Sequence, residues 1–227
     1  DADHYNKKAN MVKEAFRARF YDSETHTIAT GSQTAYSMPL VVGLVDEEDR
    51  EAVTLNLIEA IEKDNFALTA VDVGFHYLVR ALQDAGAHDV IWKMNARDDV
   101  PGYGYQLKKG ATALTESWPA LRYVSNNHMM LGHLMEWLYS GIGGIRQAPG
   151  SLAYERIIID PQPVCDLTWA EVSHRCIKGE IRVRWAEESS GYKMKIRIPE
   201  GSDADVRFAG RKQSKLGPGE HELMIDK

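Results

Sequence analysis

The stretch VDVGFHYLVRALQDAG, residues 71–86, carries the pattern that decides the fold of the first part of this chain. Apolar residues recur in it at steps of three and four, which is the spacing of one face of an α-helix. Gly86 stands where such a helix would stop. We therefore predict a helix here with one buried face. The apolar positions of that face are Phe75, Leu78, Val79 and Leu82.

Helical spacing also marks other segments in the first two thirds of the chain. Residues 46–49 are all acidic, which suits a helix N-terminus, and apolar residues then recur at helical steps through Ile61. Residues 5–20 and 33–44 have the same spacing. The run MMLGHLMEWLY, residues 129–139, is apolar nearly all round, so we expect a helix that is buried between others. Because these helices come in pairs joined by short turns, we predict an array of helical hairpins.

In the last third of the chain the period of the apolar residues falls to two, which indicates β-strands. In IRVRW and YKMKIRI the apolar residues alternate with basic ones, and residues 178–179 and 189–191 lie between the runs as hairpin turns. We predict five or six antiparallel strands in a small β-sandwich at 149–227, after a helical domain at 1–148. The predicted strands include residues 156–159, 181–185, 192–198, 206–208 and 221–225.

The composition narrows the kinds of partner that this chain can have. The net charge is −6, which argues against nucleic acid, because phosphate binding needs a basic face. No apolar run approaches the roughly 18 residues of a membrane helix. The histidines and cysteines lack metal-ligand spacing, and the glycine-rich GIGGIRQAPG follows a predicted helix instead of a strand, so we expect no metal and no cofactor. The chain opens with DADHYNKKAN and no initiator methionine, so we expect a fragment or a processed chain of unknown compartment.

A single carboxylate stands in KKGATALTESWPA, residues 108–120, a stretch of small and hydroxyl residues without a helical stripe. This carboxylate is Glu116, and Trp118 lies close to it in the sequence. Sugar hydrolysis uses one carboxyl group to protonate the leaving oxygen and a second to activate water or attack the sugar. Glu116 is therefore a candidate catalytic residue. The alternatives are that it caps the following helix or is merely solvated.

Two polar residues near predicted helix starts are candidates for ligand contact. His128 precedes the apolar run at 129–139, where a polar side chain can point into a cavity. The alternative is a half-buried histidine behind a helix cap formed by Ser125 or Asn126. Asp72 lies near the start of the helix in 71–86, and a plain N-terminal cap is the alternative for it.

Aromatic residues near Glu116 are further candidates. Tyr103 and Tyr105 lie among glycines in DVPGYGYQLKKG, and Trp118 follows Glu116. Aromatic rings on loops often stack on sugar rings, but packing inside the protein explains them equally well.

These residues fall in segments that closely resemble the bacterial α-L-rhamnosidases of glycoside hydrolase family 78. The resemblance covers almost the whole chain in the family's order, and the GAT…E.W motif with the downstream NH and EWLY is fairly specific. The C-terminal IIIDPQP…LTWAEVSHRCIKGEIRVRW resembles the β-sandwich that follows the family's catalytic barrel. The other matching segments are TGSQTAYSMPLVVGLV (30–45), LTAVDVGFHYLVRALQDAGAHDV (68–90), GYGYQLKKGATALTESW (102–118) and NNHMMLGHLMEWLYSGIGGI (126–145).

The resemblance implies part of an (α/α)6 barrel, six helical hairpins around a central pocket, followed by a β-sandwich. It also implies inverting hydrolysis of a rhamnose-containing carbohydrate, with the glutamate of the motif, Glu116, as the general base. The tryptophan of the motif corresponds to Trp118, and the histidine of the NH pair, His128, corresponds to a substrate contact. We expect Asp72 and Tyr103 to be neighbours of this site.

Two departures from the family pattern matter. Thr115 stands where many members have an aromatic residue directly before the base, so the sugar subsite is expected to differ. No stretch matches the earlier motif that carries the general acid, so the chain resembles the C-terminal part of a longer enzyme. We expect the N-terminal remainder to be its partner, and we expect the isolated chain to be inactive and to self-associate. If the acid lies within this chain after all, Asp72 and Asp99 are the first residues to test.

Two other functions stay open at this point. One is a non-catalytic carbohydrate-binding protein that kept the barrel, for which Thr115 is the best support. The other is a hydrolase that acts on a different deoxysugar or an acidic sugar with the same barrel.

Overall fold

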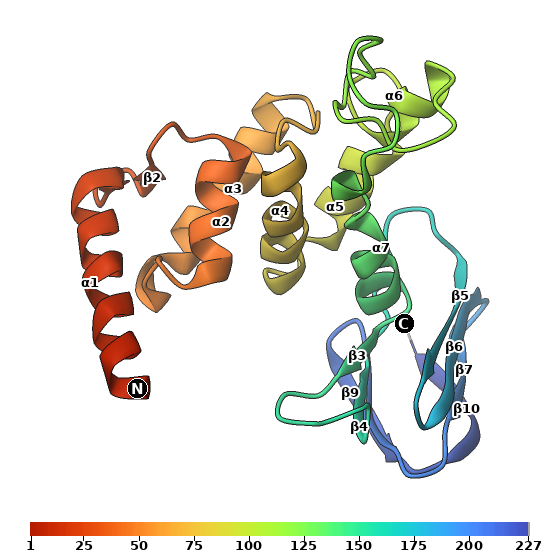
Figure 1. The fold of residues 1–227 in the computed structure, drawn as a ribbon. Coiled ribbons are helices and arrows are strands. Elements are labelled where there is room, and N and C mark those ends of the chain that lie inside the picture. Colours follow the sequence, from red (N-terminus) through yellow and green to blue (C-terminus); the bar gives the residue numbers. More distant parts are fainter. Residues whose placement is uncertain (227) are drawn as a thin grey trace. The chain divides into compact units, whose positions relative to one another are not determined.

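The computed structural model of the protein describes residues 1–226 (Figure 1). The chain divides into two compact units, Asp1–His133 and Leu134–Lys227. The first unit is mainly helical and the second mainly β, which confirms the predicted order. The division lies earlier than the boundary predicted after residue 148. Strand β3 (Ile145–Gln147) pairs with β4 (Arg156–Ile159) in a sheet of the second unit.

Helices make up most of the first unit. Segment 103–108, which reads in the sequence as a glycine-containing loop, forms a short helix. A small hairpin of β1 (Tyr21–Asp22) and β2 (Thr27–Ile28) connects the first two helices. The helices are α1 (Ala2–Phe20), α2 (Gln33–Val42), η1 (Glu47–Asp49), α3 (Arg50–Lys63), α4 (Asp72–Asp84), α5 (His88–Ala96), α6 (Tyr103–Lys108) and η2 (Met129–Leu131).

Helix α4 packs against both α2 and α5 in the first unit. Its predicted apolar stripe is buried, including Phe75. Helix α2 approaches so closely that a Cβ atom on Gly74 would lie 2.1 Å from Thr34 Oγ1, so this position requires glycine. The predicted stripe of α3 is buried as well, with Val53, Leu57 and Ile61 inaccessible to solvent.

A buried glutamine connects α2 to the segment that precedes α4. The side-chain amide of Gln33 donates to the carbonyl of Ala67 at 2.8 Å. Its side-chain oxygen accepts from the backbone N–H groups of Thr69 and Ala70 at 3.1 and 3.2 Å. These bonds satisfy the polar groups of a segment that has no regular secondary structure and fix the chain just before Asp72.

The prediction of one buried helix over residues 129–139 is wrong. The segment forms η2, then α7 (Leu134–Trp137), then a π-helical turn η3 (Leu138–Ile142), and the division between the two units falls within it. Gly132, a poor helix former, follows η2 directly. Of the run, Leu131 and Trp137 are buried, while Met129, Met130 and Met135 are exposed.

The second unit is a sandwich of two four-stranded sheets (Figure 1). The sequence predicts a sandwich, but with five or six strands instead of the eight found within residues 134–226. The strand order is β10-β7-β6-β5 in one sheet and β3-β4-β8-β9 in the other. Strands β4 and β8 run parallel, so the expectation of a wholly antiparallel sandwich is corrected at this pair. The remaining strands are β5 (Trp169–Cys176), β6 (Gly179–Glu188), β7 (Gly191–Ile198), β8 (Asp203–Phe208), β9 (Arg211–Leu216) and β10 (Gly219–Asp226).

Alternating apolar residues of the two sheets form the core of the sandwich. Trp185 on β6 and Phe208 on β8 meet edge to face, with ring centroids 6.3 Å apart. The indole N–H of Trp185 donates to the carbonyl of Ile142 at 2.8 Å, which ties the π-helical turn η3 to this core. The segment 134–142 is thereby part of the β unit.

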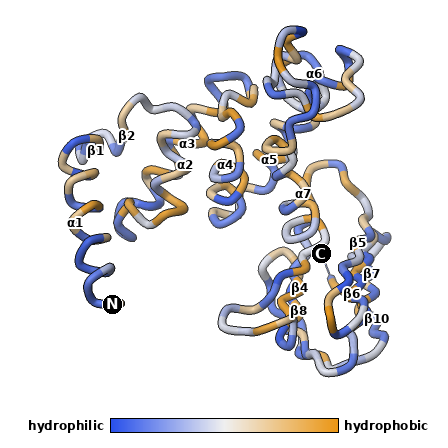
Figure 2. Tube along the Cα trace, viewed as in Figure 1, coloured by the Kyte–Doolittle hydropathy of each residue, from blue (hydrophilic) through white to orange (hydrophobic). Residues whose placement is uncertain are grey.

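Helix α1 differs from the other α-helices because none of its residues is buried. Figure 2 colours its first turns hydrophilic, and the apolar Met11 and Val12 that follow are exposed. None of the helices within residues 1–226 combines the length and the hydropathy needed to cross a membrane.

Candidate active site around Glu116

Residues 109–128, which contain Glu116, form a loop without helix or strand (the green loop next to α6 in Figure 1). Backbone hydrogen bonds nevertheless hold its two limbs together. The N–H of Glu116 donates to the carbonyl of Ser125 at 2.8 Å, and the N–H of His128 donates to that of Leu114 at 2.8 Å. We call this segment the Glu116 loop.

The carboxylate of Glu116 is exposed, but its direction is fixed at one oxygen. The backbone N–H of Ser125 donates to Glu116 Oε2 at 3.1 Å. This is a charge-assisted hydrogen bond from a group that is itself part of the loop framework. Glu116 caps no helix in this structure, and its other oxygen is available to a substrate or a water molecule. The sequence indicates only a possible helix cap at Ser125, because a backbone contact of this kind has no side-chain signature.

Thr115, directly before the candidate base, faces the interior. It is 1% exposed, and its hydroxyl donates to the carbonyl of Ser117 at 2.7 Å. The side chain at this position therefore packs under the loop. Its difference from the aromatic residue of the family pattern affects the packing of the loop before it affects any solvent-facing surface.

Trp118 anchors the loop to the helical core. Its side chain is 2% exposed, and its indole N–H donates to the carbonyl of Ala70 at 2.7 Å. Edge-to-face contacts join it to Phe75 and Tyr103, with ring centroids 4.9 and 5.1 Å apart. In this chain the indole is a buried support of the Glu116 loop. A direct contact with a sugar stays a prediction.

Tyr103 closes the same aromatic cluster from α6. Its hydroxyl donates to the carbonyl of Leu131, which connects α6 to η2. Its ring packs edge to face on Phe75 as well as on Trp118. The ring is partly exposed and is held in a fixed orientation.

His128 and Asp72 lie next to each other at the edge of the Glu116 loop. His128 Nε2 is 3.5 Å from Asp72 Oδ2, an ion-pair distance at the outer limit of a hydrogen bond. Asp72 is the first residue of α4, and its side chain makes no cap, because Val71 is the N-cap residue. The structure thus brings His128 and Asp72 together, and the carboxylate of Asp72 lies where it can orient the imidazole.

Asp99 is unsuited to the role of general acid. Arg97 donates two hydrogen bonds to its two carboxylate oxygens, at 2.8 and 2.6 Å. These bonds lower the pKa of Asp99 to about 2. A general acid must hold its proton near neutral pH, whereas Asp99 is ionised there.

No group of three or more metal-binding side chains occurs among residues 1–226. The residues around the Glu116 loop supply one fixed carboxylate, a histidine–aspartate pair and an aromatic support. These groups are suited to general acid–base catalysis on a polar substrate.

Family models match both units of the chain. The model of the bacterial alpha-L-rhamnosidase 6 hairpin glycosidase domain matches residues 1–142, and that of the bacterial alpha-L-rhamnosidase C-terminal domain matches residues 144–222. The chain belongs to the bacterial α-L-rhamnosidase family. The helical unit is accordingly part of a six-hairpin barrel, and the β unit is the domain that follows it.

Individual relatives resemble the chain over most of its length. It is 28% identical over 215 residues to an α-L-rhamnosidase of Streptomyces avermitilis, covering 91% of this chain and 21% of that protein. It is 29% identical over 210 residues to an α-L-rhamnosidase of Alteromonas sp. (strain LOR), covering 88% and 22%. The chain thus spans about a fifth of the length of these curated relatives.

A solved relative shares the fold as well. The crystal structure of the Streptomyces avermitilis α-L-rhamnosidase complexed with L-rhamnose superposes with a TM-score of 0.91 at 25% identity. The match covers 100% of this chain and 24% of that chain. The helical unit and the β unit therefore correspond to a contiguous fraction of a larger α-L-rhamnosidase fold.

Proposed function

We propose that this chain is the base-bearing part of an inverting glycoside hydrolase that removes terminal α-L-rhamnose from oligosaccharides, polysaccharides or glycosides. The observation that carries the proposal is the exposed carboxylate of Glu116, oriented by the Ser125 N–H on a loop with a buried tryptophan anchor. A rigidly supported carboxylate is what a general base requires, because its reach to the water must not vary.

In the proposed reaction, Glu116 accepts a proton from a water molecule as the water oxygen bonds to the anomeric carbon. The bond between that carbon and the glycosidic oxygen breaks on the opposite face of the sugar. A general acid protonates the departing oxygen. We expect this acid in the N-terminal remainder of the enzyme, since the pKa of Asp99 is about 2 and Asp72 lies beside His128.

His128 is proposed to donate a hydrogen bond to a sugar hydroxyl. Its backbone is fixed to Leu114, and its Nε2 atom lies 3.5 Å from Asp72 Oδ2. The nearby carboxylate favours a defined orientation of the ring. Asp72 would act as a positioning residue, and Tyr103 and Trp118 would support the loop beneath the sugar.

The test is the substitution Glu116→Gln in the complete enzyme. The amide keeps the shape of the side chain but accepts no proton, so turnover of nitrophenyl α-L-rhamnoside should fall by at least about a hundredfold. Glu59→Gln, an exposed carboxylate of α3, is the matched control and should leave turnover unchanged. Turnover within about threefold of wild type in Glu116→Gln would remove Glu116 from the mechanism.

The stereochemistry and the sugar are tested separately. Proton NMR of the first product should show the β anomer of L-rhamnose, and an α anomer would exclude inversion. A panel of nitrophenyl glycosides distinguishes the alternatives. Faster hydrolysis of another deoxysugar would replace rhamnose as the proposed substrate. Hydrolysis of none of the glycosides would favour a carbohydrate-binding protein without catalysis.

A further inference from the structure

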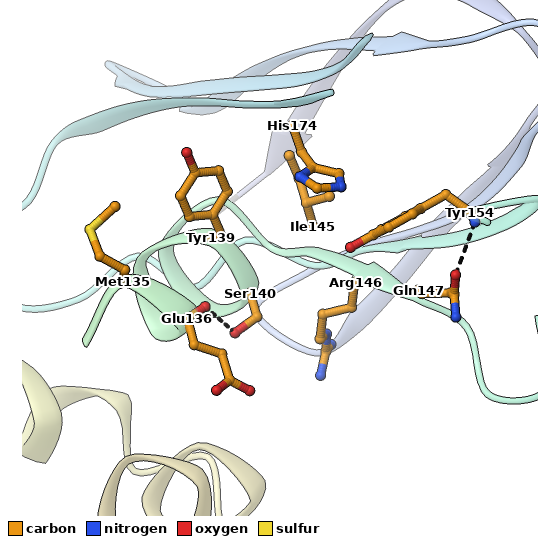
Figure 3. A pocket seen from close by; sticks show the side chains of 9 residues that line it. All are labelled: Met135, Glu136, Tyr139, Ser140, Ile145, Arg146, Gln147, Tyr154 and His174. Carbon is orange, nitrogen blue, oxygen red and sulfur yellow. Dashed lines mark hydrogen bonds between the residues drawn. The ribbon is translucent and has the colours of Figure 1, made fainter. Parts of the chain in front are cut away.

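A pocket of about 430 Å³ opens on the β unit, between the α7–η3 segment, strand β3 and strand β5 (Figure 3). Its volume falls within the roughly 300–1,000 Å³ that is usual for small-molecule sites. All of its lining residues lie between positions 135 and 174, and none belongs to the Glu116 loop. We call it the Tyr154 pocket.

Three rings form one wall of the Tyr154 pocket. The rings of Tyr154 and His174 lie with centroids 4.7 Å apart at 45°, and that of Tyr139 stands 6.5 Å from His174 at 83° (Figure 3). Tyr139 is 38% exposed, so its ring is accessible to a ligand. Rings of this kind present an apolar face with a polar edge, which suits a molecule that has both.

The position of Tyr154 is fixed by its backbone. Ala153 and Tyr154 both adopt positive φ, at 49° and 60°, a region that residues with a side chain seldom occupy. The side-chain oxygen of Gln147 accepts the Tyr154 N–H at 3.0 Å, the bond drawn in Figure 3. Strained backbone that is held by a specific contact is characteristic of ligand sites.

Polar side chains line another part of the pocket. Arg146 donates to Asp160 Oδ2 at 3.1 Å, and the other oxygen of Asp160 accepts the N–H of Gly210 at 2.9 Å. The guanidinium group is therefore held at one end and keeps further N–H groups for a ligand. Glu136 and Gln147 contribute carboxylate and amide groups beside it. This mixture of planar donors and acceptors matches the hydroxyl pairs of a sugar.

We propose that the Tyr154 pocket is a second carbohydrate site that holds one pyranose residue of a longer substrate. The C–H face of the sugar packs on Tyr154 and Tyr139, and Arg146, Glu136 and Gln147 take its hydroxyl groups. The choice of a 6-deoxyhexose such as rhamnose rests on the proposed function, and the apolar Met135 and Ile145 give its methyl group a place. The pocket's own chemistry requires only a pyranose.

Binding stoichiometry in the complete enzyme tests this site. Calorimetry with a rhamnose oligosaccharide, in a Glu116→Gln background that prevents hydrolysis, should detect two classes of site. Tyr139→Ala and Tyr154→Ala should each remove one class, whereas Tyr154→Phe should retain it because the ring remains. The control is Trp169→Ala, which removes a 54% exposed ring that also lies on β5 but outside the pocket.

Kinetics give an independent measurement. In the otherwise wild-type enzyme, Tyr139→Ala should raise KM for a long rhamnose-bearing polysaccharide by about fivefold or more relative to its effect on KM for nitrophenyl rhamnoside, because tethering through a second site acts only on long substrates. If Tyr154→Ala fails to fold, the exposed Tyr139→Ala decides the matter alone.

A single class of site in the parent enzyme, or a second class that survives Tyr139→Ala, would overturn the proposal. An enzyme that hydrolyses no rhamnoside but loses a pyranose site with Tyr139→Ala would keep this inference and refute the proposed function. An enzyme that hydrolyses rhamnosides but has one class of site would support the proposed function and refute this inference.

Discussion

Trp118 shows how a single residue can matter to a site that it need not touch. Its ring packs edge to face against Phe75 and Tyr103, and its indole N–H donates to the carbonyl of Ala70. Ala70 is in turn fixed by Gln33, so the chain of contacts runs from α2 through the segment before α4 to the Glu116 loop. The position of Glu116, the candidate base, therefore depends on the burial of Trp118, whose ring lies at a distance from the carboxylate.

The first prediction concerns this anchor. Trp118→Ala should lower the free energy of unfolding by about 3–5 kcal/mol, because it leaves a cavity in a packed core. Trp118→Phe should cost less, about 1–3 kcal/mol, mainly through the unsatisfied carbonyl of Ala70. Urea denaturation followed by circular dichroism measures both. Trp169→Ala, which removes an exposed ring, should cost below about 1 kcal/mol, and an equal cost at the two tryptophans would contradict the assignment.

Helix α1 is held to the rest of the helical unit largely by charge. Lys13 and Arg17 form ion pairs with Asp46 at 2.7 and 3.1 Å, and Arg17 also pairs with Asp49 at 2.9 Å. Burial alone would raise the pKa of Asp49, but hydrogen bonds from Arg17 and Tyr21 outweigh it and keep that pKa below its usual value. Burial and the hydrogen bond to Asp49 raise the pKa of Tyr21 to about 12.

These shifts predict a pH window for the docking of α1. The lowered pKa of Asp49 gives stability that is present above its unfolded pKa of about 4 and is lost as pH falls through the lower folded value. The raised pKa of Tyr21 gives stability that is present below about 10 and is lost as pH rises through about 12. Hydrogen exchange of α1 amides should therefore accelerate, relative to the intrinsic rate, as the solution is acidified below about pH 4.

Asp49→Asn should accelerate that exchange even at neutral pH and weaken its acid dependence. Glu14→Gln, on the exposed face of the same helix, serves as the matched variant and should behave as wild type. Unchanged protection of α1 in Asp49→Asn would mean that apolar contacts hold the helix instead.

The sequence predicts those elements whose buried face shows as a periodic pattern of apolar residues. The stripes of α3 and α4 and the alternation in β6 and β7 follow directly from one face of each being buried. Strands β3, β5 and β9 are not among the predicted strands. Strand β9, RKQSKL, is a charged edge strand without apolar alternation, and such edges are common where a sheet meets solvent. The prediction for residues 129–139 is wrong because composition shows neither that the helix is interrupted at Gly132 nor which methionines are exposed.

The candidate site was predictable in its residue types and not in its geometry. Glu116 stands out as a carboxylate in a stretch of small residues, and the resemblance to a family assigned it a role. The fixing of its carboxylate by the N–H of Ser125 depends on backbone contacts between two limbs of a loop, for which side-chain patterns carry no signal. The same holds for the Tyr154 pocket, which joins residues of α7, η3, β3, the turn before β4, and β5.

As a whole molecule, the chain presents apolar side chains that soluble proteins usually cover. On α1, Met11 is 68% exposed and Val12 56%. The chain spans about a fifth of its curated relatives, and we expect further parts of the enzyme to cover surfaces of this kind.

The 227 residues alone should therefore self-associate and hydrolyse no rhamnoside, because the general acid is expected elsewhere. Light scattering and an assay with nitrophenyl rhamnoside measure the two properties. Met11→Lys with Val12→Lys should reduce the association, and Glu14→Gln should not. A monomer that turns over substrate would place the acid within this chain, with Asp72 then the first residue to replace.

The parallel pairing of β4 with β8 has a consequence for the order in which the β unit is made. Strands β5, β6 and β7 pair through short hairpins with strands that adjoin them in the sequence, whereas β4 must wait for β8, which begins at Asp203. Until then β4 is paired on one side only, with β3, and its other edge can accept a foreign strand. During synthesis, β5, β6 and β7, which are encoded after β4, can therefore pair with one another before β4 acquires its second neighbour.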